Sequence, residues 1–488
     1  MQKRILVTLL ALGLLYLLLL IPASGKKNAV TGAVKNPFAW NRDDQWLQME
    51  KQFVLARQLK AEKLDSGISV LKLAAESKLA LLQQPGISPA DTNWTAAENI
   101  FFNLASLVAV RQEQLPWFIE YYNKTRNAIK FHSQHWSIGE EKVRNTVYEL
   151  LYGMRAAVEE VLLQAKPGDY PPAMQVATVK TAAPVTTIFG IEVHSGDLLV
   201  SRGGAEVSAL ISRGNDYPGN FSHVALVYVD EKTKQSFLIE AHIERGVAVS
   251  SVEQYENDKK LRFMVMRPRA DLPQLQTDPL CVHKAAKAVY DEAIARHIPY
   301  DFKMDFMDST RMFCSEVGSY AYKKAGIAVW KYPSSISSPG VVDWLHQFGV
   351  ENFITQMPSD LEYDPQLNVV AEWRDPGTLF KDHIDNAVMD VLLEKANAGE
   401  QIGYNHWQLP VVRVLKGYCV IKNLFGKEGM IPEGMNATQA LKNQTFVAMH
   451  VKLKERTMQL ANEFIKENGY RPPYWQLVTL ARKAATEN

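Results

Sequence analysis

Cysteine is scarce in this sequence. The 488 residues include only Cys281, Cys314 and Cys419. Three thiols form at most one disulfide bond and leave one thiol over, so a scaffold held together by disulfide bonds is excluded. The sequence leaves open whether Cys281 and Cys419 pair. An unpaired thiol in an exported protein needs a chemical reason, and nucleophilic catalysis would supply one.

An excess of one charge is also lacking. Lys and Arg number 54 against 53 Asp and Glu, which gives a formal net charge of +1, and the two signs are interleaved along the chain. Without a basic stripe for phosphate groups, nucleic-acid binding is excluded. Proline and glycine are not in excess, and 47% of the residues are hydrophobic, as in ordinary globular proteins. A chain of this length is expected to form roughly three structural units.

A long hydrophobic run stands at the start of the chain. Two basic residues precede an apolar stretch from Ile5 to Ile21, a pattern typical of export signals. Ala23 and Gly25 are small residues suited to a cleavage site, whereas the apolar stretch approaches the length that spans a membrane. Residues 1–25 are therefore predicted to be a signal peptide or a signal anchor, with the anchor preferred. This places the protein in the periplasm or on the periplasmic face of the inner membrane.

Residues 40–166 carry helical periodicity without any strand signal. The helical pattern breaks at 85–89, where two prolines occur, and again at 133–139. Asp91 or Thr92 can serve as the N-cap of the second helix. This segment is predicted to be an α-helical bundle of three long helices.

After a Pro-Gly-rich segment at 167–172 the periodicity changes to short runs rich in β-formers. These runs are 197–201, 224–229, 236–241 and 263–267. Helical stretches follow at 283–297 and 314–324. Strands followed by helices predict an α+β domain at 188–340.

Residues 341–488 are predicted to form a mostly helical C-terminal region. Its best helices are expected at 341–348, 379–396 and 443–468. The pattern indicates no function for this region.

Three side chains of the central domain could carry catalysis. Cys314 stands directly before an amphipathic helix, and a helix N-terminus favours a thiolate and offers free N–H groups to an oxyanion. His223 opens a predicted strand after a loop expected to be flexible, where it could act as the base. The neighbouring strand can bring the carboxylate of Glu240 to the imidazole. Taken singly, these signals also fit a buried structural cysteine and a surface histidine.

Five short blocks of the central domain occur in an order seen in a known family. They are Gly196-Asp-Leu-Leu-Val200, Phe221-Ser-His-Val-Ala-Leu-Val227, Ile239-Glu-Ala241, Tyr300-Asp-Phe302 and Phe313-Cys-Ser-Glu316. This order resembles the YiiX/YaeF-type permuted papain-fold hydrolases, relatives of the NlpC-type cell-wall peptidases, in which the histidine precedes the cysteine. The resemblance implies a permuted papain-like (NlpC-like) domain with a small antiparallel sheet and packed helices, flanked by the two helical regions.

The resemblance also implies a site. Cys314 would be the nucleophile, His223 the base and Glu240 the acid that orients the imidazole. His242 faces the same side as Glu240 and could take its place. Tyr300 could donate a hydrogen bond to the substrate or the oxyanion. Neither a cofactor nor a metal ion is expected.

The resulting hypothesis is a cysteine hydrolase, exported or anchored, that cleaves an amide or ester bond through an acyl-enzyme. Its expected partners are a peptide or acyl substrate of the cell envelope, with cell-wall peptides first, and the inner membrane through the N-terminal segment. The oligomeric state is not indicated.

Two other functions remain open. Lecithin retinol acyltransferase-like proteins also order histidine before cysteine and act on lipids, so a lipid acyltransferase or deacylase is the alternative enzyme. Their nucleophile is typically followed by Glu-His, whereas Ser-Glu follows Cys314 here. The third reading is a non-catalytic binding or scaffold protein of the envelope, which would not depend on Cys314.

Overall fold

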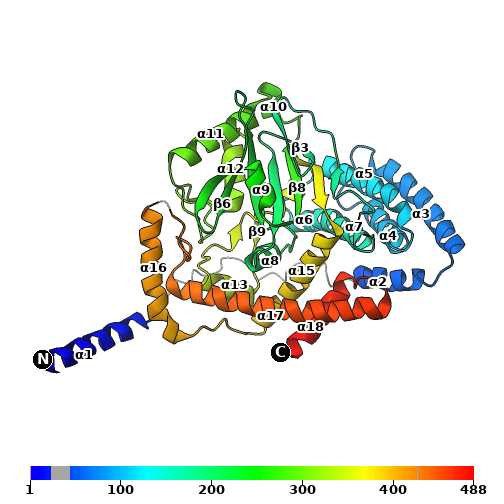
Figure 1. Cartoon of the computed structure of the whole chain (residues 1–488). Helices are drawn as coiled ribbons and strands as arrows, with labels where there is room; N and C mark the ends of the chain where they lie inside the picture. The colour runs from blue at the N-terminus through cyan, green and yellow to red at the C-terminus, as the bar shows by residue number, and fades with distance from the viewer. Residues whose placement is uncertain (1, 24–43, 167, 426, 488) are drawn as a thin grey trace.

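The computed structural model describes residues 2–23, 44–166, 168–425 and 427–487 (Figure 1). Gly25 of the predicted cleavage site and residues 40–43 of the predicted bundle lie outside the described residues.

The apolar N-terminal segment forms helix α1, Gln2–Leu19, which projects from the body of the molecule (Figure 1). Within the described residues, no helix combines the length and the apolarity that are needed to cross a membrane.

The predicted bundle contains more helices than the three expected. Its helices are α2 (Asp44–Ala56), α3 (Ala61–Leu82), α4 (Thr92–Val108), α5 (Leu115–Ser133), α6 (Glu141–Tyr148) and α7 (Met154–Leu163), with a π-helical turn at Glu149–Gly153. Asp91 is the N-cap of α4, because its side chain accepts a hydrogen bond from the backbone of Asn93. The breaks at 57–60 and 109–114 were missed because neither contains proline or glycine.

A seven-stranded antiparallel sheet forms the centre of the molecule, in the order β1-β11-β8-β4-β5-β6-β7 (Figure 1). Its strands are β1 (Ala173–Gln175), β4 (Leu198–Gly203), β5 (His223–Val229), β6 (Ser236–His242), β7 (Gly246–Ser251), β8 (Lys260–Pro268) and β11 (Leu367–Arg374). The predicted α+β class is confirmed, and the four predicted strands are β4, β5, β6 and β8. β11 was missed because it is buried almost throughout and so lacks the alternation of a half-exposed strand.

Alternating residues of the strands face two different layers. Leu198 and Val200 of β4 share a core with helices α11 (Cys281–Ala295) and α12 (Cys314–Lys324). Leu199 faces the opposite side, under α9 (Val252–Asn257) and the hairpin of β2 (Val185–Ile188) and β3 (Ile191–His194). This period of two follows from the pleat of the strand. On the first of these faces, α12 packs directly against β5, the strand that begins at His223.

The C-terminal region wraps around the sheet and the bundle. Its main helices are α13 (Pro339–Gln347), α15 (Pro376–Asn397), α16 (Leu409–Leu424), α17 (Ala437–Asn468) and α18 (Tyr474–Thr486). Helix α15 contacts α7 of the bundle, α8 (Glu206–Arg213), β8 of the sheet and the later helices α17 and α18. One hydrophobic core runs through the bundle and helices α13, α15, α17 and α18. The three predicted regions are therefore packed together as one body.

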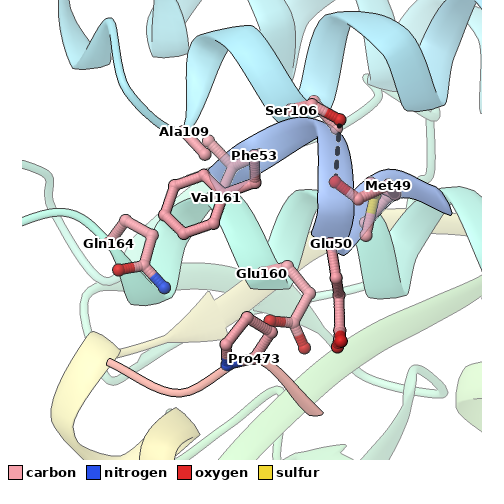
Figure 2. A pocket seen from close by; sticks show the side chains of 11 residues that line it. Met49, Glu50, Phe53, Ser106, Ala109, Glu160, Val161, Gln164 and Pro473 are labelled. Carbon is pink, nitrogen blue, oxygen red and sulfur yellow. Dashed lines mark hydrogen bonds between the residues drawn. The ribbon is translucent and has the colours of Figure 1, made fainter. Parts of the chain in front are cut away.

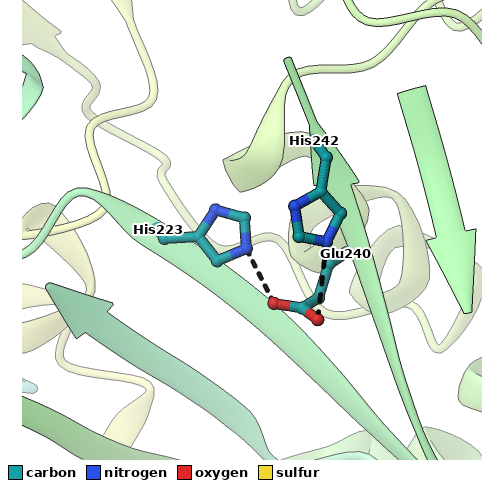
Figure 3. Close-up of side chains that lie close together, drawn as sticks. All are labelled: His223, Glu240 and His242. Carbon is teal, nitrogen blue, oxygen red and sulfur yellow. Dashed lines mark hydrogen bonds and ion pairs between the residues drawn. The ribbon is translucent and has the colours of Figure 1, made fainter. Parts of the chain in front are cut away.

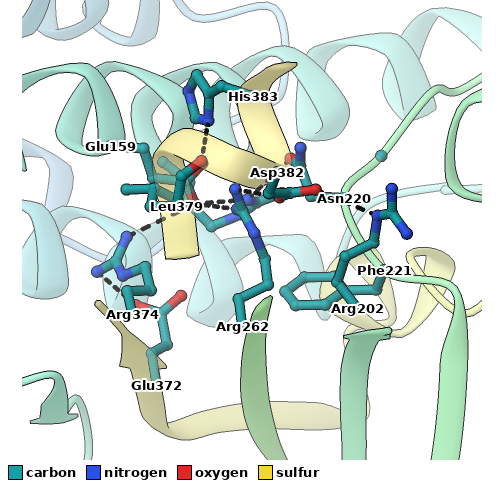
Figure 4. A network of polar contacts seen from close by, with 12 residues as sticks. Glu159, Arg202, Asn220, Phe221, Arg262, Glu372, Arg374, Leu379, Asp382 and His383 are labelled. Atoms are coloured by element: carbon teal, nitrogen blue, oxygen red, sulfur yellow. Dashed lines mark hydrogen bonds and ion pairs between the residues drawn. The ribbon is translucent and has the colours of Figure 1, made fainter. Parts of the chain in front are cut away.

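Buried ion pairs join the same three regions (Figure 4). Arg155 of α7 contacts Glu159 at 2.9 Å and Glu362 at 2.8 Å, and all three side chains are almost completely excluded from solvent. Arg262 of β8 contacts Glu159 and, at 2.6 Å, Asp382 of α15. Each buried charge therefore has a partner of opposite sign, which offsets the cost of removing it from water.

Candidate active site

Cys314 is the first residue of α12, as predicted. Phe313 before it is extended, and the carboxylate of Glu316 accepts a hydrogen bond from the Phe313 N–H at 2.9 Å. The Cys314 residue is 4% exposed, and its thiol donates to the carbonyl oxygen of Ser222 over 3.7 Å. The thiol thus lies at the N-terminus of a helix, where unpaired backbone N–H groups can hold an anion.

His223 begins β5, and the carbonyl of Ser222 next to it is the one that contacts the Cys314 thiol. The loop before His223 was expected to be flexible, and this expectation is wrong. Residues 215–222 are buried apart from the partly exposed Pro218. A Cβ added to Gly219 would lie 2.1 Å from the Ser359 hydroxyl, so this loop packs directly on the neighbouring segment.

The flanking regions hold this loop in place. The Tyr148 hydroxyl of the bundle donates to the Pro218 carbonyl, and Arg155 donates to the Asn220 side chain at 3.0 Å. From the C-terminal side, the Ser359 hydroxyl accepts a hydrogen bond from the Phe221 N–H at 3.1 Å. The bundle therefore contributes to the position of His223, a role that its sequence did not indicate.

Glu240 lies between two imidazoles (Figure 3). It pairs with Ala225 across β5 and β6, which places its side chain on the same face as His223. One carboxylate oxygen is 2.9 Å from Nε2 of His223, and the other is 3.6 Å from Nε2 of His242. Glu240 thus forms the hydrogen bond with His223, while His242 lies near the other oxygen of the carboxylate.

The surroundings of His223 favour its protonated form. Burial opposes the charge, but hydrogen bonds to Cys314 and Glu240, together with their negative charges, raise the pKa of His223 to about 9. Burial also opposes the charge on Glu240, yet the hydrogen bond from His223 and the nearby imidazole of His242 hold its pKa below the usual range. Because Nε2 of His223 contacts Glu240, Nδ1 is the nitrogen left for Cys314. The arrangement can move a proton between sulfur and imidazole.

Two further groups near Cys314 stay uncharged. Burial raises the pKa of Glu316 to about 9, and the nearby acidic groups Asp301, Asp305 and Cys314 add to this effect. Burial likewise raises the pKa of Tyr300 well above its usual value, with the Cys314 charge as the next cause. Tyr300 therefore keeps a proton that it can donate. A neutral Glu316 adds no negative charge beside a thiolate, a role that sequence reasoning did not assign to it.

His223, Glu240 and His242 also have the side-chain types of a metal site. Their ligand atoms all lie within 4.8 Å of one another. Two imidazoles and a carboxylate suit a transition-metal ion such as Zn²⁺.

A cavity that these residues do not line lies between α2, α4 and α7 (Figure 2). Two carboxyl groups, Glu50 and Glu160, line it together with apolar side chains. Burial, and next the charge of Glu160, raise the pKa of Glu50 to about 8. Glu50 also accepts a hydrogen bond from the backbone of Trp475, so it helps to join α2 to α18. No cysteine lines this cavity, which separates it from the candidate site.

Replacing Glu240 by glutamine is expected to lower the hydrolytic rate by about 10²-fold without abolishing it, because the imidazole loses its orienting carboxylate. The variant also loses the charge that raises the pKa of His223. The alkaline limb of the pH–rate profile, near pH 9 in the unchanged protein, should move to lower pH. The measurement is kcat/KM over the pH range. The matched variant His242→Gln should change both quantities less; a larger loss in His242→Gln would assign the orienting role to His242.

Comparison with known proteins agrees with the sequence resemblance. Residues 192–371 match the family model of the permuted papain-like amidase enzymes, YaeF/YiiX, C92 family. The crystal structure of the metalloprotein YiiX from Escherichia coli O157:H7 aligns with 37% of this chain and 97% of its own, at 20% identity and a TM-score of 0.30. No curated protein matches the chain. The match of residues 192–371 to this family model confirms the resemblance and supports cysteine hydrolase activity.

Proposed function

We propose that this protein hydrolyses an amide bond through Cys314, His223 and Glu240. The observation that carries the proposal is the chain of contacts from the Cys314 thiol through the imidazole of His223 to the carboxylate of Glu240. This is the order of nucleophile, base and orienting acid that acyl transfer needs. The match to an amidase family favours an amide over an ester.

In the first half of the reaction, His223 takes the thiol proton and the Cys314 sulfur attacks the carbonyl carbon. The electron pair of the C=O bond moves to the oxygen, where backbone N–H groups at the start of α12 stabilise the negative charge. When the tetrahedral intermediate collapses, the imidazolium gives its proton to the leaving amine. The raised pKa of His223 suits this step, since the proton is held until the amine needs it.

In the second half, water attacks the thioester while His223 takes one of its protons. The C–S bond then breaks, the acid product leaves and the thiol is restored. Glu240 stabilises the imidazolium in both halves. The His223 side chain is 20% exposed, whereas Cys314 is nearly buried, so the substrate approaches along the imidazole edge.

The substrate we propose is a peptide of the cell envelope. The support is the apolar run from Ile5 to Ile21 behind two basic residues, a pattern of exported proteins. With this segment the protein would act outside the cytoplasm, attached to the inner membrane or released from it.

Trapping of the acyl-enzyme tests the reaction and the substrate class together. The full chain is mixed with short peptide amides or with acyl esters of lipids, quenched in acid and digested. A mass increase is then sought on the peptide that contains Cys314. We expect the acyl group of a peptide amide on Cys314, and its absence in His223→Ala. Acylation by lipid esters alone would favour the lipid acyltransferase or deacylase, and labelling of Cys281 instead would contradict the assignment of the nucleophile.

A further inference from the structure

Helix α16 presents an apolar stripe to solvent. The stripe consists of Val411, Val414, Tyr418 and Ile421 of α16, together with Trp407 in the 3-10 turn before the helix and Phe425 directly after it. Successive members are three or four residues apart, so they lie along one side of the helix. Their exposure is high, at 69% for Val414 and 77% for Phe425. An exposed apolar face of this extent marks a surface that meets another apolar phase.

The stripe is not the side by which α16 packs on the protein. Leu409 and Cys419 are completely buried, against Leu441 of α17 and against Ile431. The helix is thus apolar on two sides, and only one of them is covered by this chain. The covered side is sufficient to attach α16 to α17. Packing within the fold therefore does not explain why the outer side is apolar.

Helix α1 contacts the N-terminal end of α16. The Tyr16 hydroxyl donates to the Trp407 carbonyl at 3.0 Å, and Arg413 donates to carbonyl groups of Leu18 and Ile21. Beyond this contact, α1 projects from the body with its apolar side chains exposed, for example Leu10 and Leu14 (Figure 1). Two exposed apolar surfaces therefore adjoin at one edge of the molecule.

The charges around the stripe are those of a helix that lies on an anionic membrane. From 407 to 430 the sequence holds four basic residues, Arg413, Lys416, Lys422 and Lys427, and a single acidic one. Lys416 donates hydrogen bonds to the carbonyl groups of Pro432 and Glu433, so its charge is directed toward the protein. Interfacial helices combine such basic residues with tryptophan, phenylalanine and other apolar residues on the opposite side. Each basic residue near an anionic lipid surface adds to the attraction.

We propose that the outer stripe of α16 lies in the headgroup region of an anionic lipid bilayer, beside α1. This extends the proposed membrane attachment from the N-terminal segment to a surface of the folded domain, and it is independent of the proposed hydrolysis. Two adjoining attachments hold the body in one orientation, whereas a single N-terminal segment would let it rotate.

Tryptophan probes test where the membrane lies. Phe425→Trp places a probe at the end of α16 away from α1, and Leu73→Trp places one on α3, at a residue that is 70% exposed and lies on the opposite side of the molecule (Figure 1). The full-length variants are added to vesicles of phosphatidylcholine and phosphatidylglycerol with brominated acyl chains. We expect the added emission of Phe425→Trp to be quenched and that of Leu73→Trp to persist. If both persist, or if neither protein binds the vesicles, the proposal is wrong.

Vesicle affinity separates the stripe from α1. Val414→Asn with Ile421→Asn and Phe425→Asn should weaken binding to the anionic vesicles roughly tenfold or more. The control Val70→Asn with Leu73→Asn removes exposed apolar side chains from α3 and should leave the affinity unchanged.

Two outcomes of the affinity measurement would overturn the proposal. If only Leu10→Asn with Leu14→Asn weakens binding, α1 attaches the protein alone and the stripe faces water. If the α16 variant instead converts a dimer into a monomer in sedimentation without lipid, a second copy of the chain covers the stripe. Peptide hydrolysis should stay unchanged in every variant, so a failure of the proposed activity is recognised separately.

Discussion

Replacing Cys314 by alanine is expected to lower the rate of hydrolysis by a factor on the order of 10⁴ or more, because no other group can form the acyl-enzyme. His223→Ala should cause a loss of similar size, since residues that act as a unit give non-additive effects. The double variant should therefore be no slower than either single one. The measurement is kcat/KM on the peptide amide identified by acyl-enzyme trapping.

Cys281→Ala is the matched control for this prediction. It also removes a free thiol, from a partly exposed position at the start of α11, and should leave the rate unchanged. A protein that keeps its full activity without Cys314 would contradict the hydrolase mechanism. If Cys314→Ala keeps the binding of an envelope ligand and no turnover is found in either protein, the non-catalytic binding role would be favoured.

Replacing Arg155 by methionine is expected to lower the free energy of unfolding by about 3–5 kcal/mol. The guanidinium contacts Glu362, Glu159 and Asn220 at 2.8 to 3.0 Å, and it is completely buried. Methionine leaves buried carboxylates with less compensation, and a buried charge without its partner costs far more than a lost surface pair. Denaturant unfolding followed by circular dichroism measures this loss.

Arg482→Met is the control for the buried pair. Arg482 also binds a glutamate with two hydrogen bonds, to Glu394, but its side chain is 44% exposed. Its loss should cost about 1 kcal/mol or less. Equal losses in the two variants would contradict the view that burial makes the Arg155 network important. Because Arg155 also holds Asn220, its variant should show a lower rate even at a temperature where the protein remains folded.

The places of the candidate catalytic residues in the fold could be predicted from the sequence. His223 and Glu240 stand on two predicted strands, and Cys314 stands at the start of a predicted helix. Strand alternation already placed Glu240 and His242 on one face, and the structure places both beside His223. These placements could be predicted because they depend on local periodicity and on short blocks with a known order.

The limits of the central sheet could not be predicted. β1 and β11 lie outside the segment 188–340, and β11 joins β8 across about a hundred residues of intervening chain. Pairing of this kind depends on which apolar surfaces meet in the folded protein, and no local pattern contains that information. The missed turns of the bundle have the same origin, since no residue within them breaks a helix.

The sequence by itself determined the α+β class and the balance of charges, and it singled out Cys314, His223 and Glu240 as candidate nucleophile, base and acid, because each of these rests on composition, periodicity or short motifs. Only the tertiary structure decided that Glu240 rather than His242 forms the hydrogen bond with His223, and that the loop before His223 is buried. It also decided that Arg155 and Tyr148, far away in the sequence, hold that loop. These are contacts between distant segments, and they exist only once the bundle, the sheet and the C-terminal helices share one core.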